Sequence, residues 1–230
     1  MRLALAVLTL LFLLSSVTPA ATFTDPLTSA NPDMIFSAPV ASLNASYTPD
    51  GLVISRDPSA STGTNIDIIA LSTSFLLTGD FTYTVHVDAS QLAPISSPVT
   101  SEVLMYTNDA QVELTNQPVF ASGGPPGLWA DWGVLSGCGS AQMDLLIERT
   151  GNTLSVGCNG GTGWNEFSFV SAAPAWNAGF ELAAEGGPGA TQVTFSNLQI
   201  TYGTPEPATW TFGLAAGIFG LIMRRRRARQ

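Results

Sequence analysis

Residues Phe81–Asp88 read FTYTVHVD, which is the clearest structural pattern in a chain of 230 residues. Apolar side chains stand at the odd positions of this stretch and polar side chains at the even positions. Successive side chains of a β-strand point to opposite faces of a sheet, so a period of two predicts a half-buried strand. We therefore expect Tyr83 and Val85 to face a core and His86 to lie on the opposite face.

Short apolar runs of the same kind recur on both sides of this stretch, separated by Gly, Pro, Asn and Ser. No segment between residues 22 and 203 shows a sustained helical period. The other predicted strands are Leu52–Ser55, Asn65–Leu71, Glu102–Thr107, Gln111–Leu114, Met143–Glu148, Thr153–Cys158, Glu166–Val170, Gly179–Ala184 and Gln192–Tyr202. Roughly ten short strands without helices predict an all-β fold, either an antiparallel β-sandwich or a barrel.

Two local signals refine this prediction. In Gln192–Tyr202 the apolar residues change from odd to even positions after Phe195, which predicts a β-bulge at Ser196–Asn197. Arg149–Asn152 predicts a tight turn between two strands, in which Gly151 is free to adopt a positive φ. Residues 21–203 show no internal repeat, and we expect them to form one domain.

Five stretches of this domain form a recognisable combination. They are FTDPL (23–27), GDF (79–81), LLIERTGNTL (145–154), GGTGW (160–164) and VTFSNLQI (193–200). Together they resemble the concanavalin A-like lectin/glucanase sandwich, in its laminin-G-like bacterial branches. The resemblance implies a jelly roll of two packed antiparallel sheets with one concave face, and it often implies carbohydrate or protein binding. A fold does not fix a function.

The N-terminus has the pattern of a secretory signal peptide. Arg2 precedes an apolar run, Leu3–Leu14, and small residues follow up to Ala20. A positive start, about 7–15 apolar residues and a small-residue cleavage site define such signals. We expect residues 1–20 to be removed after Ala20; an uncleaved anchor is the alternative.

The C-terminal tail, residues 204–230, has three parts in a fixed order. These are a tripeptide (Pro205, Glu206 and Pro207), an apolar segment (residues 208–223) and an arginine cluster (Arg224, Arg225, Arg226 and Arg227). The apolar segment predicts a short transmembrane helix of about 24 Å. The arginines predict a cytoplasmic end, so the domain would lie on the outer side of the membrane.

This order resembles the PEP-CTERM sorting signal of Gram-negative bacteria. The resemblance implies recognition by an exosortase, cleavage near the tripeptide and a link to exopolysaccharide production. We expect an exported protein that is membrane-anchored at least transiently and then reaches the cell surface or the medium. A permanent anchor is the alternative.

The charge of the domain limits its partners. Residues 21–204 contain two basic residues, Arg56 and Arg149, against sixteen acidic ones, for a formal charge of −14. A surface this acidic repels phosphate backbones, so nucleic acid is excluded as a partner. A plain soluble surface and the binding of cations both remain open.

Cys138 and Cys158 are the only cysteines. In an exported protein they predict a disulfide, with a stabilisation of roughly 3 kcal/mol for a loop of about 20 residues. A turn centred on Thr150–Gly151 would place Cys158 opposite residues near Met143 and not opposite Cys138, so the segment before Met143 must curl back. Two thiols and one histidine fall short of a structural zinc set, so neither a metal nor a cofactor is predicted.

Aromatic residues in loops are the candidate binding residues. Trp129, Trp132 and Trp164 follow Gly-rich segments, and loops on a rigid sandwich are where binding residues concentrate. They predict platforms on which sugars stack; core packing is the alternative.

Catalysis on a glycosidic bond needs two neighbouring carboxylates. Catalytic members of this fold carry them in a Glu-x-Asp-x-Glu run, which is absent, and Asp144 and Glu148 match it only loosely. The sequence therefore predicts a non-catalytic protein that interacts with extracellular polysaccharide or matrix. A glycan-cleaving or glycan-modifying enzyme and a purely structural surface protein remain alternatives.

Overall fold

The computed structural model describes residues 20–37, 42–94, 97–107, 110–115, 127–130, 133–134, 141–171 and 175–203. Within these residues Thr22–Tyr202 form one compact unit, and its regular structure consists of β-strands. Almost all of the predicted signal peptide and the whole predicted tail lie outside the described residues, so both stay predictions. In the part of the chain that is described, no helix is long and apolar enough to cross a membrane.

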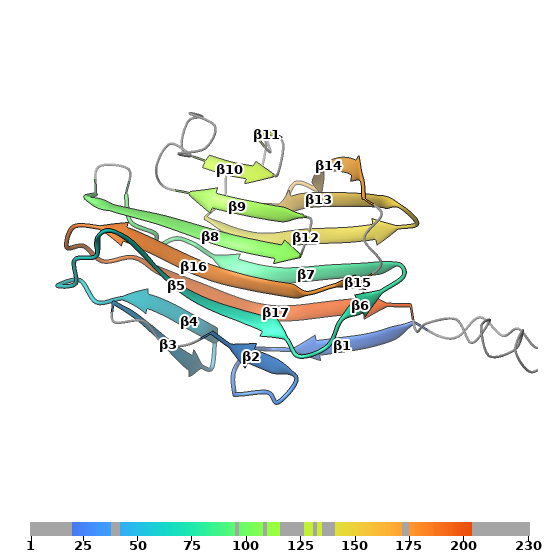
Figure 1. Cartoon of the computed structure of the whole chain (residues 1–230), viewed down its shortest axis with the longest axis horizontal. Coiled ribbons are helices and arrows are strands. Elements are labelled where there is room, and N and C mark those ends of the chain that lie inside the picture. The colour runs from blue at the N-terminus through green and yellow to red at the C-terminus, as the bar shows by residue number, and fades with distance from the viewer. Residues whose placement is uncertain are drawn as a thin grey trace, which may run out of the picture. The chain divides into compact units, whose positions relative to one another are not determined.

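Two large sheets and one small sheet make up the unit (Figure 1). Sheet A has the order β14 (Asn165–Val170), β13 (Thr153–Asn159), β12 (Gln142–Thr150), β7 (Phe81–Asp88), β17 (Gln192–Tyr202), β4 (Gly51–Arg56) and β3 (Leu43–Thr48), and β1 (Ala21–Asp25) also pairs with β17. Sheet B has the order β11 (Gly133–Val134), β10 (Gly127–Ala130), β9 (Gln111–Thr115), β8 (Val99–Thr107), β16 (Ala178–Gly186), β5 (Gly63–Thr73) and β2 (Met34–Phe36). The small sheet pairs β15 (Ala175–Trp176) with β6 (Leu77–Thr78).

Neighbouring strands along the two strand orders run antiparallel. Figure 1 shows the strands of sheets A and B running in nearly the same direction, as in aligned sandwiches. The antiparallel β-sandwich expected from the sequence is therefore confirmed.

The core lies between the two sheets and follows the predicted alternation. On β7, Tyr83 and Val85 are buried while His86 is only half-buried, as the period of two requires. Phe180 of β16 and Phe195 of β17 join the sheets, with ring centroids 4.4 Å apart. Burying a side chain of this size stabilises the fold by about 1.5–3 kcal/mol.

All ten predicted strands are present, most of them a few residues longer than predicted. The strands that the sequence did not indicate are β1, β2, β3, β6, β10, β11 and β15. These are short, or they lie at or near the ends of their sheets. β3 (LNASYT), for example, does alternate apolar and polar side chains, but its middle residues are exposed and the small Ala45 makes its apolar side weak.

The predicted bulge and the predicted turn are both confirmed. The register of β17 against β7 shifts between Ser196 and Gln199, and Asn197 has a φ of 52°. Gly151 has a φ of 61° in a two-residue turn that joins β12 to β13.

Within the hairpin Cys158 pairs with Leu145, two positions from Met143, because the two turn residues are Gly151 and Asn152 and not Thr150 and Gly151. Cys158 has no free thiol. Its predicted partner, Cys138, lies outside the described residues, so the pairing of Cys138 with Cys158 stays a prediction.

Candidate functional site

The outward side of sheet B carries the most unusual side chains of the described domain. Along β8 every second residue is buried, and Glu102, Leu104 and Tyr106 lie between them, on the side away from the core. The register of β8 against β9 and β16 places outward residues of all three strands side by side. We call this side of sheet B its outer face.

Four glutamates meet on the outer face, and we call them the glutamate face: Glu102, Glu113, Glu181 and Glu185. Leu104 of β8 pairs with Glu113 of β9 on one side and with Glu181 of β16 on the other. Glu102 lies two positions along β8 from Leu104, which makes it the diagonal neighbour of both. Diagonal neighbours are roughly 7–8 Å apart at Cα, within reach of long side chains.

Three of these carboxyl groups, those of Glu102, Glu113 and Glu181, resist ionisation. Burial, and then the nearby charge of Glu102, raises the pKa of Glu113 to about 7. Burial also raises the pKa of Glu102 and of Glu181, and the charges of Glu185 and Glu102 respectively raise them further. The carboxyl groups are therefore close enough to interact electrostatically, as expected for groups on one patch of a sheet.

No arginine neutralises the glutamate face within the described residues. The guanidinium of Arg56 donates to the carbonyl oxygens of Gly186 and Gly187. Arg149 donates to the carbonyl oxygens of Gly79 and Gly151. Both cations are thus engaged with backbone atoms, and the negative charge of the face stays uncompensated.

Glu113 has an unmet hydrogen-bonding requirement. The residue is 8% exposed, and its buried Oε1 atom has no hydrogen-bond partner. Leaving a buried acceptor unpaired costs about 1–3 kcal/mol. Buried unpaired groups in native proteins are often explained by a ligand or another function.

A shallow hollow lies beside these carboxyl groups. It is lined by Ile66, Thr100, Glu102, Ala183, Ala184 and Glu185. The small side chain of Ala183 stands between Glu102 of β8 and Ile68 of β5 in the register, which leaves room above the sheet.

Tyr106 extends the glutamate face across β16. A Cβ atom at Gly179 would stand 2.6 Å from the Tyr106 hydroxyl oxygen, so the ring passes directly over this glycine. Burial and the charge of Glu181 raise the pKa of Tyr106 to about 12, so the hydroxyl stays protonated at neutral pH and can donate a hydrogen bond.

The three predicted tryptophans do not gather in one place. Trp129 lies on β10 of sheet B, where its backbone pairs with Glu113. Trp164 is 42% exposed and lies in the turn after β13 of sheet A. Trp132 lies outside the described residues. Trp129 is thus the predicted platform position that the register brings to the glutamate face.

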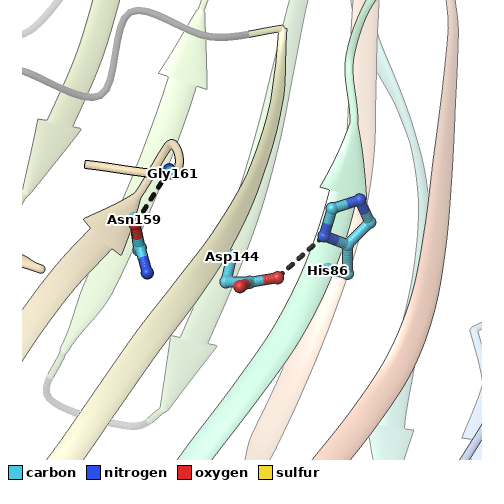
Figure 2. A network of polar contacts seen from close by, with 4 residues as sticks. All are labelled: His86, Asp144, Asn159 and Gly161. Atoms are coloured by element: carbon cyan, nitrogen blue, oxygen red, sulfur yellow. Dashed lines mark hydrogen bonds and ion pairs between the residues drawn. The ribbon is translucent and has the colours of Figure 1, made fainter. Parts of the chain in front are cut away.

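The side of sheet A that faces away from the core carries a smaller polar network (Figure 2). His86 Nδ1 lies 2.7 Å from Asp144 Oδ1, across the pairing of β7 with β12. Asn159 Oδ1 accepts hydrogen bonds from the backbone N–H groups of Gly161 and Gly163, which fixes the turn that leads to Trp164.

Ser196 pairs with His86 on the side opposite Asp144, so a serine, a histidine and an aspartate follow one another across three strands. Activation of a serine nucleophile needs a hydrogen bond from its hydroxyl to the histidine. Among the hydrogen bonds of the described residues, His86 bonds to Asp144 and not to Ser196. Among the described hydrogen bonds, the row therefore joins only its histidine and its aspartate. Asp144, one member of the loose carboxylate pair, is engaged in it.

A metal centre is not present among the described residues, since they contain no group of three or more His, Cys, Asp or Glu arranged to hold an ion. The glutamate face also lacks the histidine or thiolate that zinc sites use. The arrangement can accept hydrogen bonds and positive charge, and Glu113 can exchange a proton near neutral pH.

Comparison with solved structures supports the fold. The chain is similar to the CBM2 module of the evolved Dit of Lactobacillus casei BL23 phage J-1, with a TM-score of 0.56 and 8% identity over 82% of this chain and 99% of that chain. It is also similar to the exoplasmic/lumenal domain of VIP36 bound to Ca²⁺ and Man3GlcNAc, with a TM-score of 0.53 and 10% identity over 82% and 92%. The form of VIP36 bound to Ca²⁺ and Man2 gives a TM-score of 0.50 and 11% identity over 79% and 87%.

Identities this low show a shared fold and no more. The domain shares the antiparallel β-sandwich fold of these structures, which supports the fold part of the resemblance. No protein-family model matches the chain, and no curated protein matches it.

Proposed function

We propose that this chain is an exported, non-catalytic β-sandwich protein that binds extracellular polysaccharide on the glutamate face of sheet B. The observation that carries the proposal is the buried Oε1 atom of Glu113, an acceptor with no donor, on the same face of sheet B as the hollow lined by Glu102 and as the ring of Tyr106. Sugar hydroxyls are abundant hydrogen-bond donors, and an aromatic ring offers an apolar surface for a sugar face. The VIP36 forms bound to mannose sugars show that a related sandwich holds glycans.

The sugar would make two kinds of contact, hydrogen bonds to carboxylate acceptors and stacking on an aromatic ring. Glu102, Glu113 and Glu181 accept hydrogen bonds from the sugar. The ring of Tyr106, held over Gly179, lies beneath the sugar, and Trp129 is the tryptophan we assign to stacking. Trp132 and Trp164 remain candidate contacts for longer chains that reach beyond the face.

A binding assay with paired variants tests this function. The exported protein should bind at least one polysaccharide of a broad panel without releasing reducing ends. Tyr106→Ala should weaken that binding by about tenfold or more, while Phe167→Ala, on β14 of sheet A, should leave it unchanged. Binding that survives Tyr106→Ala and Glu102→Gln together contradicts the assignment of this face.

Export is part of the proposal, with an exosortase and the general export machinery as partners. The signal peptide (residues 1–20) and the sorting tail (residues 204–230) motivate it. Mass spectrometry of the mature protein from its native host should find that both segments are gone. Recovery of a main species that ends at Gln230 contradicts the processing of the tail.

A second candidate function, glycan cleavage, is favoured by one observation. Glu113, with a pKa of about 7, lies diagonal to Glu102, and such a carboxylic acid can donate a proton to a leaving group at neutral pH. Cleavage would release reducing ends from the polysaccharide that binds. Glu113→Gln would then stop the release and keep the binding.

A further inference from the structure

We infer that the glutamate face selects glycans that carry free, protonated amino groups, such as polymers of 2-amino sugars, over neutral and acidic glycans. This inference rests on the proposed function, because it names the class of glycan that the same face would bind. It follows from the charge of the face, from the unpaired acceptor of Glu113 and from the spacing of the carboxyl groups.

The charges around Glu113 are all of one sign. Glu102 lies on β8, and Glu181 and Glu185 lie on β16. The outward residues of β5 in the same register, which include Ile68 and Ala70, are uncharged. Among the described residues of the face the one further titratable group is Tyr106, which is neutral until far above physiological pH. A uronic acid polymer would meet uncompensated repulsion here, whereas a cation would not.

An ammonium group would supply the hydrogen-bond donor that Glu113 Oε1 lacks. It provides three N–H donors and a positive charge, and hydrogen bonds between ionised partners are shorter and stronger than neutral ones. A hydroxyl could fill the same position, but it would leave the mutual repulsion of the carboxylates in place. A metal ion is the other cation to consider, and the described residues hold no cluster suited to one.

The spacing suits an oligomer more than a single amine. Glu113 and Glu181 stand on either side of Leu104, on strands two positions apart in the sheet. Two strand spacings amount to roughly 9–10 Å, so successive amines along a chain can reach different carboxylates. A charged oligomer would therefore gain from several contacts, each of them weakened by salt.

Binding of an ammonium group should also release a proton, which can be measured. At about pH 6 Glu113 is mostly protonated, because its pKa is raised to about 7 by burial and by Glu102. An ammonium group favours the carboxylate form, so Glu113 must release its proton when the amine binds. A neutral sugar gives no such release, since it interacts with either form.

Isothermal titration calorimetry with the full exported chain tests the inference. The probes are a glucosamine hexamer with free amines, its fully N-acetylated counterpart and a galacturonic acid hexamer, each titrated at about pH 6. We expect the free-amine hexamer to bind about tenfold or more tightly than the acetylated one, and the acidic hexamer not to bind. Equal or tighter binding of the acetylated hexamer overturns the amine preference and keeps glycan binding, whereas failure of all glycans to bind overturns both.

Single-residue variants test which glutamates produce the preference for the free-amine hexamer. Titrations in two buffers of different ionisation enthalpy should reveal proton release for the free-amine hexamer, and Glu113→Gln should abolish it. Glu102→Gln and Glu181→Gln should each reduce the preference several-fold, and they carry the test if Glu113→Gln does not fold. Glu166→Gln, which removes an exposed charge from β14 of sheet A, is the matched control and should change neither quantity. Proton release that persists in Glu113→Gln contradicts the inference.

Discussion

At the scale of the residue, Glu113 is the position where stability and the proposed function conflict. An outward-facing glutamate normally keeps both oxygens in water, but this one is 8% exposed and lacks a donor for Oε1. The folded domain consequently holds it as the neutral acid over a wide pH range. Such unpaired groups are unfavourable for folding, and their persistence is most simply explained by a ligand that completes them.

The pH dependence of stability follows from this environment. The pKa of Glu113 rises from 4.5 to about 7 on folding, so the folded state binds the proton more tightly than the unfolded chain does. The resulting stability is fully present below the unfolded pKa and is lost as the pH rises through about 7.

We therefore expect Glu113→Gln, which resembles the protonated acid, to stabilise the domain by roughly 1–3 kcal/mol at about pH 8. At about pH 5 the same change should have an effect below about 0.5 kcal/mol. Urea denaturation at both values measures the difference, and Glu166→Gln serves as the exposed control. An effect of Glu113→Gln that does not depend on pH would refute this account of the residue.

The sequence could not identify Glu113, and the reason is physical. A search for catalytic carboxylates looks for a run on one strand, whereas Glu102, Glu113 and Glu181 come from three strands. Local sequence shows which face of its own strand a residue occupies, but it does not show the register between β8 and β16, which lie about 80 residues apart. The tryptophans could be chosen as candidates from the sequence because a rare aromatic residue is recognised without knowledge of the strand register.

At the scale of the element, the strands that alternate most clearly were the ones predicted. β7 and β8 each bury one face against the core, and that burial imposes the pattern. The bulge in β17 was predictable for the same reason, since an extra residue moves apolar side chains to the other parity. Edge strands such as β3 are harder to predict because they bury little surface, and the alternation in β3 is short and includes the small Ala45.

β16 shows how an element shapes the face above it. Gly179 lets the ring of Tyr106 lie across the strand, and an added Cβ would stand 2.6 Å from the hydroxyl oxygen and 3.0 Å from the carbonyl oxygen of Leu71. Gly179→Ala should therefore displace the ring, destabilise the domain by about 1–3 kcal/mol and weaken glycan binding.

Thermal unfolding and a binding titration on the Gly179→Ala variant measure the two effects. Tyr106→Phe is the companion variant, since it keeps the ring and removes the hydroxyl. Binding that is unaffected by Gly179→Ala would show that the position of this ring is unimportant.

At the scale of the whole molecule, the acidic domain carries its charge outside the membrane if the two terminal segments act as predicted. A formal charge of −14 over residues 21–204 favours solubility and encounters with cationic polymers. The fold class followed from the strand pattern, while the ligand class needed the register of sheet B. The export signals are read from the sequence alone.

The predicted disulfide belongs to this scale because it links β13 to a segment outside the described residues. Peptide mapping without reduction should find Cys138 joined to Cys158 in freshly exported protein. Its reduction should lower the free energy of unfolding by roughly 3 kcal/mol. A free thiol on Cys138 would contradict the pairing.

The central claim is that glycan binds on the outer face of sheet B, and carboxyl footprinting tests it most directly. The full exported chain is labelled with a carbodiimide and an amine, with and without the glycan that binds, and each carboxyl group is quantified by mass spectrometry. We predict that the glycan protects Glu102 and Glu181 from labelling and leaves Glu148 and Glu166 of sheet A unchanged. Protection of Glu148 and Glu166 without protection of Glu102 and Glu181 would place the binding site on the opposite sheet and contradict the account.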